Sequence, residues 1–390
     1  MSAAITPVAG GAFLAAARAN LPGDEPAQRE QALARFAAAG WPSPVLEHWY
    51  YSDWTILAER RYTAATDSES PAFGFDRAQL LPLKPLDAVQ STTRFALDAL
   101  NRALASAGVD KTFDGHAQVP FLITQHVGQP QAMRHLRHRI ALSAGAQATL
   151  ILWDAPDVAA DTLLTAVMTL DLAAGSRLTL LRVQQAGAQA TRALHLSASV
   201  AADATLEVVH MDVAAARARQ EFDITLTAPG ACYRQAGLVA AGDQHRLDTF
   251  AHVRHAAPRT ESRIAARMLA AGQARLALNA KVQVQPGALK SDSETRLSNL
   301  LLSDRAEIDA KPDLVIDADD VKCAHGASFG QLDEDALFYL RARGVDAATA
   351  RALLTQAFAQ AALEHIPDHL PGLKNWAEGR VRSLLGEAAA

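Results

Sequence analysis

The chain has 390 residues, 49% of them hydrophobic and 20% charged, with a formal net charge of −5. This composition is typical of a soluble globular protein, and the negative charge argues against a nucleic-acid binder that depends on phosphate contacts. Its two cysteines, Cys232 and Cys323, offer no disulfide framework. It contains no run of 18 apolar residues and no basic leader before its N-terminal apolar patch. We therefore expect a cytoplasmic protein without a membrane span.

Residues 1–118 are expected to form a helical region followed by a linker. Pro26 is expected to begin a helix that ends at Ala39, because Gly40 and Pro42 follow. Trp41 and the aromatic residues of LEHWYYSDW (residues 46–54) are expected to pack together against the next domain. A further helix is predicted around Thr92–Ala107.

Residues 119–330 show the alternation of apolar and polar residues that indicates strands with one buried face. Few helical patterns separate these strands, which argues against a doubly wound α/β sheet. The residue pattern alone leaves a β-solenoid and a β-sandwich as equal alternatives. The clearest alternating positions are Leu276, Leu278, Ala280, Val282 and Val284. Turn residues recur at Gly145, Gly175, Asp203, Gly230, Gly272 and Asp304.

Residues 331–390 return to a helical pattern. Asp333 lies in an acidic run suited to the start of a helix, with Leu337 and Leu340 on its inner face. Asp346 is expected to cap a second helix, Ala347–His365, along which an apolar stripe runs. That stripe comprises Leu353, Leu354, Ala357, Phe358 and Ala361. We expect this unit to bury its apolar surface on the strands or on a partner.

The chemically most informative pair is Cys323 and His325, because a thiolate and an imidazole together suit zinc, copper or iron. In an extended strand, residues i and i+2 point to the same face. This parity would also place Asp317 and Asp319 beside the pair. Two ligands do not complete a metal site, so the others would come from elsewhere. The alternative is a solvent-facing edge strand with an incidental thiol.

The segment DADDVKCAHGASFGQLDEDALFYLRARG (residues 317–344) resembles the C-terminal signature of the SufD branch of the SufB/SufD family of iron–sulfur cluster assembly proteins. LEHWYYSDW is similar to a short tryptophan–tyrosine motif that the family carries near its N-terminus. Further similar segments are TFAH (249–252), PRTES (258–262), KVQVQP (281–286) and NLLLS (299–303).

This resemblance implies a mainly β protein, a right-handed parallel β-helix with helical N-terminal and C-terminal regions. It also implies a non-catalytic subunit that works with a SufB-like paralogue and a SufC-like ATPase. His325 and Cys323 would then contribute to a nascent iron–sulfur cluster or iron shared with the paralogue, with none bound stably by the isolated chain. The C-terminal helices, including Asp333, Leu337, Leu340, Leu353 and Phe358, would dock the ATPase.

The resemblance also implies that this chain supplies half of a site. Leu297 stands where the paralogue has a cysteine, and Gly326 or Ala327 where it has a glutamate. Whether the isolated chain pairs with itself remains open.

Two other functions remain as alternatives. A β-helix enzyme acting on polysaccharides would use Asp317, Asp319 and Asp320, and would call for a secretion signal that the sequence does not clearly carry. A stand-alone metal-binding or redox module would use Cys323 and His325 alone.

Three further patterns are interpreted as structural. His252 and His255 are expected on opposite faces of a strand, and Cys232 is expected to be buried as a small apolar residue. The basic segment MRHLRHRI (residues 133–140) is interpreted as a solvated strand face rather than an anion site.

Overall fold

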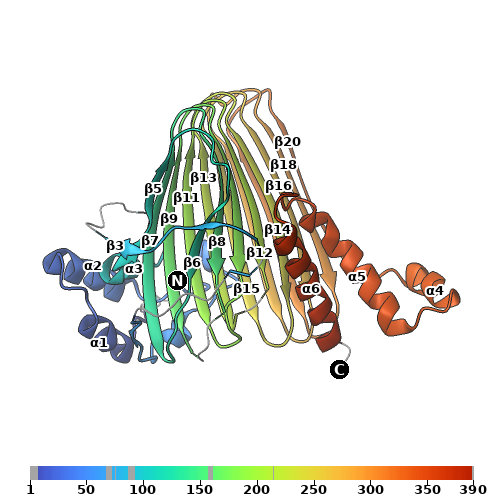
Figure 1. Cartoon of the computed structure of the whole chain (residues 1–390), viewed down its shortest axis with the longest axis horizontal. Helices are drawn as coiled ribbons and strands as arrows, with labels where there is room; N and C mark the ends of the chain where they lie inside the picture. Colours follow the sequence, from blue (N-terminus) through green and yellow to red (C-terminus); the bar gives the residue numbers. More distant parts are fainter. Residues whose placement is uncertain are drawn as a thin grey trace, which may run out of the picture.

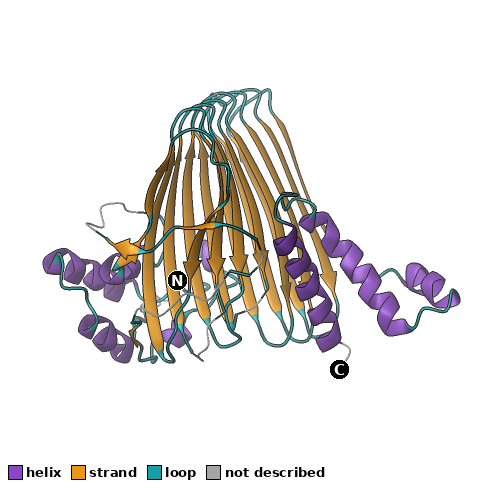
Figure 2. Ribbon diagram, in the orientation of Figure 1, coloured by secondary structure: helices purple, strands orange, loops and turns teal. Residues whose placement is uncertain are grey.

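The computed structural model describes residues 8–66, 73–74, 76–86, 93–156, 161–213 and 215–388. Its body is a row of stacked coils, each of which adds one strand to each of two long sheets (Figure 1). Helices lie at both ends of this row (Figure 2). The prediction of a parallel β-solenoid with helical ends is thereby confirmed, and the β-sandwich alternative is wrong.

One sheet has eleven strands, in the order β19-β17-β15-β13-β11-β9-β7-β4-β3, with β1 and β5 also paired to β7. Its strands are β1 (Thr63–Ala64), β3 (Lys84–Pro85), β4 (Ala107–Gly108), β5 (Asp110–Phe113), β7 (Ala132–Leu142), β9 (Leu163–Leu172), β11 (Thr191–Val200), β13 (Arg217–Leu226), β15 (Arg246–His255), β17 (Arg275–Val284) and β19 (Glu307–Ile316). We call it sheet A.

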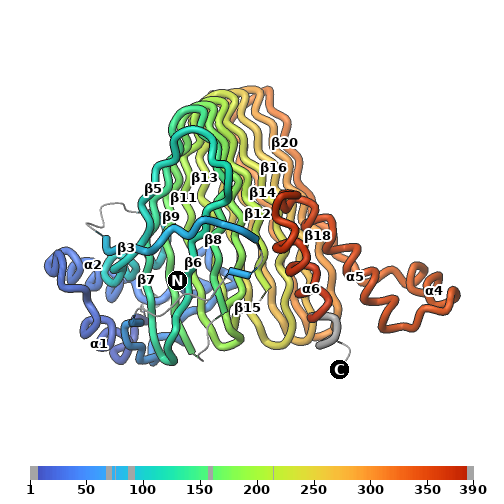
Figure 3. Tube along the Cα trace, in the orientation of Figure 1, coloured from blue at the N-terminus to red at the C-terminus, as the bar shows by residue number. Residues whose placement is uncertain are grey.

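The other sheet, sheet B, has nine strands in the order β2-β6-β8-β10-β12-β14-β16-β18-β20. Its strands are β2 (Gln79–Leu80), β6 (Phe121–Gln125), β8 (Gln147–Asp154), β10 (Arg177–Gln184), β12 (Thr205–Asp212), β14 (Cys232–Ala241), β16 (Glu261–Ala270), β18 (Asp292–Leu301) and β20 (Lys322–Gly330). The pairings that carry the coils are parallel. From β5 onward, consecutive strands of the chain therefore belong to different sheets, and Figure 3 follows the trace from one coil to the next.

The turns between strands stack on one another as the strands do. The backbone N–H of Gly145 donates to Ala174 in the next coil, and that of Gly175 donates to Ala202. Gly272 has a φ of +60°, and an added Cβ would lie 2.8 Å from the backbone nitrogen of Asp243 in the preceding turn. The predicted turn positions are thus confirmed at these three glycines, and at Gly272 a side chain would also obstruct stacking.

The interior between the sheets holds the main core. Leu276, Leu278, Ala280, Val282 and Val284 all point inward and are buried, as their alternation predicts. Each packs on equivalent positions in neighbouring coils, because the parallel register is unbroken. No single coil buries its apolar face alone, so stability depends on the stack.

The N-terminal region packs on the outer face of sheet A. Its helices are α1 (Gly11–Ala19), α2 (Pro26–Ala39) and α3 (Asp98–Leu104). Trp41, Trp49 and Trp54 are buried together with Leu163 and Val167 of the sheet. The predicted packing holds for these tryptophans, but Tyr50 and Tyr51 are exposed.

The helix predicted around Thr92–Ala107 is shorter than expected, since α3 covers only Asp98–Leu104, and Thr92 lies outside the described residues. The chain then turns into β4, where Ala107 pairs with Leu136 of β7. A Cβ on Gly108 would lie 1.5 Å from the carbonyl oxygen of Arg137. This close approach to the sheet explains why the helix stops before it.

The C-terminal region consists of α4 (Glu334–Ala342), α5 (Ala347–Leu363) and α6 (Pro371–Ala388). Helices α5 and α6 contact the outer face of sheet B at β14 and β16, whereas α4 extends away from the coils (Figure 1). Asp346 caps α5 by accepting a hydrogen bond from the backbone N–H of Thr349, as predicted.

The basic segment of residues 133–140 is not a solvated face, so that interpretation is wrong. His135, Arg137 and His138 are buried in β7, and Arg137 donates hydrogen bonds to Asp98 and Asn101 of α3. The N-terminal helices cover this strand, and they are too distant in sequence for the local pattern to reveal it.

Candidate functional site

The strand that carries Cys323 and His325 is β20, the last strand of sheet B. It pairs with β18 on one side, and no described strand lies on the other. Nearly all its residues are exposed, including Phe329, although Cys323 is half-buried. Together with β19, it forms the open end of the solenoid, where backbone N–H and C=O groups have no pairing strand.

Cys323 and His325 continue, on β20, two columns of inward-facing side chains that are in register on successive strands of sheet B. Cys323 is in register with Ser293, and His325 with Thr295. Both β18 residues are buried in the interior. Because parallel strands in register keep the same facing, the thiol and the imidazole lie on one face, over the last interior layer. The predicted shared face is confirmed.

The predicted strand parity of Asp317 and Asp319 with this pair is wrong. Those residues lie between β19, which ends at Ile316, and β20, which begins at Lys322. Asp320 has a φ of +50° within this turn, and its carbonyl oxygen accepts a hydrogen bond from the backbone N–H of Lys290. The chain passes from one sheet to the other here, which breaks the alternation.

The surroundings of Cys323 favour the thiol over the thiolate. Partial burial raises the pKa of Cys323, and the nearby carboxylate of Asp292 raises it further, while the backbone N–H of Ser293 acts in the opposite direction. A metal or an added positive charge would be needed to draw off the proton at neutral pH.

The donor set on this chain is incomplete. The described residues contain no group of three or more His, Cys, Asp or Glu side chains placed to hold a metal ion. Leu297, at the position compared with the paralogue's cysteine, is buried and in register with Ala327. A cysteine and a histidine match iron and iron–sulfur chemistry in kind but supply only two ligands.

The C-terminal residues predicted to bind a partner divide into two groups. Asp333 accepts hydrogen bonds from the backbone N–H groups of Asp335 and Ala336 and thus caps α4, and Leu337 is buried. Leu340 is half-buried. The capping role fixes the start of the helix through Oδ1, and the Asp333 side chain is exposed.

The predicted stripe of α5 is not its buried face. Leu353 is 47% exposed and Ala357 is exposed, whereas Ala359 and Leu363 pack on sheet B and α6. Phe358 is half-buried under the guanidinium of Arg267, whose Cζ lies 4.7 Å from its ring centroid. Helical periodicity alone did not distinguish two apolar faces on one helix. Other exposed apolar side chains on this arm are Phe338 and Tyr339 of α4.

Comparison with known proteins identifies the family. The profile described as "SUF system FeS cluster assembly, SufBD core domain" matches residues 123–358, more than half of the chain. The chain belongs to the SufBD family. The match covers the coils from β6 onward, the open end and most of α5.

Within the SufBD family the chain is SufD-like. It is 27% identical to the iron–sulfur cluster assembly protein SufD of Escherichia coli over 85% of this chain and 78% of that protein. A SufBD family protein of Synechocystis is 45% identical over 24% of this chain and 21% of its own length. SufD of Bacillus subtilis is 36% identical over 22% and 20%, respectively.

Among the described residues of this SufBD protein, no helix is long and apolar enough to cross a membrane. His252 and His255 lie on opposite faces of β15, as predicted. His255 is buried inside, where its ring bonds Thr260 and Ser262, and His252 faces outward toward the N-terminal region. Cys232 is buried, also as predicted.

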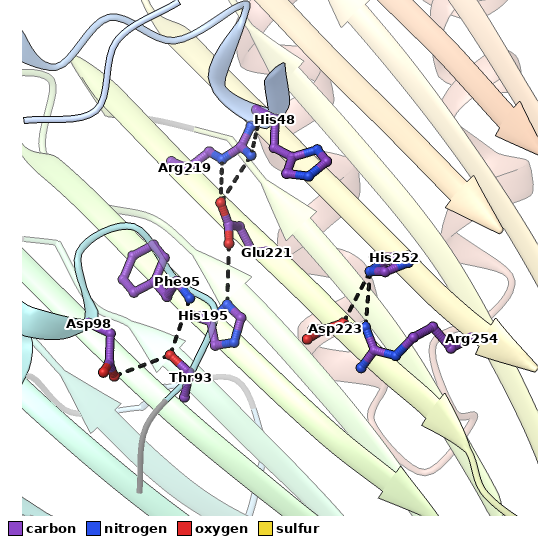
Figure 4. Close-up of polar contacts among 10 residues, drawn as sticks. All are labelled: His48, Thr93, Phe95, Asp98, His195, Arg219, Glu221, Asp223, His252 and Arg254. Atoms are coloured by element: carbon purple, nitrogen blue, oxygen red, sulfur yellow. Dashed lines mark hydrogen bonds and ion pairs between the residues drawn. The ribbon is translucent and has the colours of Figure 1, made fainter. Parts of the chain in front are cut away.

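Sequence reasoning missed a pocket of about 580 Å³ between the N-terminal segment and the outer face of sheet A. Its floor carries His195, Glu221, Asp223 and His252, and His48 lies at its wall (Figure 4). The only sequence signal was that these polar residues occupy outward positions of successive strands. They come from segments up to 200 residues apart, so local patterns could not bring them together.

Proposed function

We propose that this chain is a non-catalytic, SufD-like subunit of an iron–sulfur cluster assembly scaffold. In this proposal, the open end of the solenoid pairs with a SufB-like paralogue, and Cys323 and His325 contribute ligands to a nascent cluster held between the two. The cluster is cargo, built there and passed on. The observation that carries the proposal is an incomplete thiol–imidazole pair on an unpaired terminal strand.

The edge of β20 supports a partner of the same architecture. The backbone N–H of Lys322 bonds Ser291 across the ladder, so residues alternate between facing β18 and facing outward. By this alternation, the backbone N–H and C=O groups of Cys323 and His325 point away from β18, toward the open edge of the sheet. A second solenoid that presents its own terminal strand would satisfy those groups and bring ligands beside the pair.

We further propose that the C-terminal arm docks a SufC-like ATPase. Phe338, Tyr339 and Leu353 expose apolar surface on α4 and α5, outside the face that packs on the coils. Helix α5 contacts β14 and β16, two strands that precede β18 and β20 in sheet B. Movement of the docked ATPase would thus be transmitted through rigid elements toward the strand that carries the ligands.

The test uses the purified complex of this chain with its SufB-like and SufC-like partners. We expect His325→Ala to lower the amount of cluster assembled on the complex by roughly tenfold, because one ligand is lost. The measurement is iron and sulfide content together with visible absorbance, at matched complex yield. Ser328→Ala, on the same exposed strand, is the control and is expected to assemble normally.

An unchanged cluster yield in His325→Ala, with the complex intact, would refute the ligand role. Tight one-to-one binding of iron or zinc by the isolated chain would favour the stand-alone metal module instead. Cleavage of uronic polysaccharides by the isolated chain would revive the enzyme alternative.

A further inference from the structure

The pocket between the N-terminal segment and sheet A contains a buried imidazole with a free ring nitrogen. The His195 side chain is only 2% exposed, and its Nδ1 lies 3.3 Å from Oε2 of Glu221. Its Nε2 is buried and makes no hydrogen bond with any described residue. A buried nitrogen of this kind has given up its hydrogen bond to water without gaining one in the protein. This desolvation costs free energy unless a ligand supplies a hydrogen-bond partner.

The ionisation of Glu221 decides which His195 nitrogen carries the proton. Burial alone would raise the pKa of Glu221, but Arg219 donates two hydrogen bonds to Oε1 and holds that pKa below its usual value. A carboxylate only accepts, so Nδ1 of His195 is the donor. With Nδ1 as the donor, Nε2 is left as the acceptor nitrogen of a ring that lines the pocket.

His252, two strands away in sheet A, has the opposite tautomer: Nη1 of Arg254 lies 3.0 Å from its Nδ1 and can only donate, so Nδ1 accepts and Nε2 carries the N–H. Its Nδ1 lies 3.3 Å from Oδ1 of Asp223, a carboxylate that Arg254 also binds (Figure 4). The Nε2 of His252 is likewise buried without a hydrogen-bond partner in the described part of the chain. One acceptor nitrogen, on His195, and one donor nitrogen, on His252, thus lack partners among the described residues, in rings that line the pocket.

The wall of the pocket is flat and aromatic. The His48 ring stacks on Phe250, with centroids 4.8 Å apart and an interplanar angle of 24°. Phe250 in turn lies nearly parallel to His252, at 6.1 Å and 29°. Trp49 also lines the pocket. The Arg219 guanidinium lies over Trp49 and Phe250, 4.7 and 5.6 Å from their ring centroids, so the exposed His48 ring, backed by Phe250, is the flat surface left for a planar ligand.

Among the charged side chains that line the pocket, Glu221 and Asp223 are each paired with an arginine, whereas Lys281, Arg94 and Glu47 have no ion-pair partner among the described residues. Two unpaired cations against one unpaired acid leave an excess of positive charge. The free cations therefore favour a ligand that carries an anionic group. The pocket is not a metal site, because the described residues hold no cluster of three metal-ligating side chains.

We propose that this pocket binds a planar heteroaromatic acid of about mononucleotide size. Its ring stacks on the His48–Phe250 wall, one of its N–H groups donates to Nε2 of His195, a ring nitrogen accepts from Nε2 of His252, and its anionic group contacts Lys281 and Arg94. The volume of about 580 Å³ lies in the range of pockets that hold small organic ligands.

The test titrates the full chain with AMP, which carries a heteroaromatic ring, N–H donors and a phosphate. Calorimetry gives the affinity, and NMR of ¹⁵N-labelled histidine rings reports the Nε2 atoms of His195 and His252, assigned with His→Gln variants. We expect saturable binding that moves both signals. Adenosine and ribose 5-phosphate, the two halves of the probe, are expected to bind roughly tenfold more weakly or worse.

Variants distinguish binding of AMP in the pocket from adventitious binding elsewhere on the chain. Lys281→Gln is expected to weaken AMP binding by roughly tenfold through loss of one charge-assisted contact. Lys290→Gln, an exposed lysine outside the pocket, is the matched control and is expected to bind AMP normally. Phe250→Leu removes the ring that backs His48 and is expected to weaken AMP more than ribose 5-phosphate.

The proposal is overturned if AMP fails to bind at millimolar concentration, or if Lys281→Gln binds it as the Lys290→Gln control does. Unmoved histidine signals overturn it as well. Ribose 5-phosphate that binds as tightly as AMP would indicate a plain anion site and overturn the heteroaromatic assignment. Cys323 and His325 do not line this pocket, so these outcomes leave the cluster-site proposal untouched.

Discussion

Polar side chains inside the solenoid form a hydrogen-bonded column that leads to the open end. The ring of His255 bonds Ser262, and Ser262 donates to Ser293 of the next coil, each contact being 2.8 Å long. Cys323 occupies the next position of the same register. His255 and Ser262 are satisfied by partners in their own coil or in the next one, so the interior tolerates these polar groups.

The buried histidine makes stability depend on pH. Burial lowers the pKa of His255 to about 4, against roughly 6.5 in an unfolded chain. Between these values the unfolded chain binds more protons, so the stabilisation is complete above pH 6.5 and is lost as the pH falls toward 4. We expect the free energy of unfolding in urea to fall by up to about 1.4 kcal/mol per pH unit from this residue.

His135 and His138, whose pKa values burial lowers to about 3, add to the same slope. The control for the single residue is His255→Gln, which is expected to be less stable at pH 7 but to show a shallower pH slope. An identical slope in wild type and His255→Gln would contradict the assignment.

At the scale of elements, α5 has two apolar faces with different tasks. Ala359 and Leu363 pack against sheet B and α6, while Leu353 projects into solvent. The apolar pattern of the sequence does not distinguish the two faces, because helical periodicity shows which residues are hydrophobic but not which of them are buried by other elements. The inward face packs on the coils, and the outward face is the one proposed above to dock the ATPase.

The pair Leu363→Ala and Leu353→Ala tests this division. Leu363→Ala is expected to cost about 3 kcal/mol of unfolding free energy, since it opens a cavity beneath the helix. Leu353→Ala is expected to change stability by less than about 0.5 kcal/mol and yet to weaken binding of the SufC-like ATPase. Urea unfolding and calorimetric titration of the ATPase measure the two effects. Equal ATPase affinity of Leu353→Ala and wild type would exclude that face from docking.

At the scale of the whole molecule, the two ends of the solenoid differ. The first coils are covered by the N-terminal helices, whereas β19 and β20 form an edge with no covering element among the described residues (Figure 1). An uncovered edge invites pairing with another chain. The exposed Phe329 lies on that edge and adds apolar surface to it.

Proline substitutions on β20 test this edge. Even-numbered residues of β20 direct their backbone N–H groups toward β18, and odd-numbered residues direct theirs away from β18, toward the open edge of the sheet. Ala327→Pro is therefore expected to spare the fold and to weaken pairing with the SufB-like subunit by at least about tenfold. Ser328→Pro removes a ladder bond and is expected to destabilise the strand. Co-purification yield and thermal unfolding distinguish them, and undiminished pairing of Ala327→Pro would argue against strand-to-strand docking.

Local signals in the sequence were enough for the strands, the turns and the face shared by Cys323 and His325, but the choice of a solenoid over a sandwich came from the family resemblance. Alternation such as Leu276 to Val284 and turn glycines such as Gly272 act within one coil, where neighbours in sequence are neighbours in space. Parity then places residues i and i+2 on one side. It failed at Asp317 and Asp319, where the chain changes sheet between one strand and the next.

The exposure of the Cys323–His325 pair and the existence of the aromatic pocket were decided by tertiary structure alone. The pair is accessible because no further coil follows β20, a fact about stacking rather than about local pattern. The pocket arises where a segment near residue 48 lies over strands that begin beyond residue 190. Hydrophobic periodicity records which side of an element is apolar, whereas contacts between distant segments determine which polar side chains share a cavity.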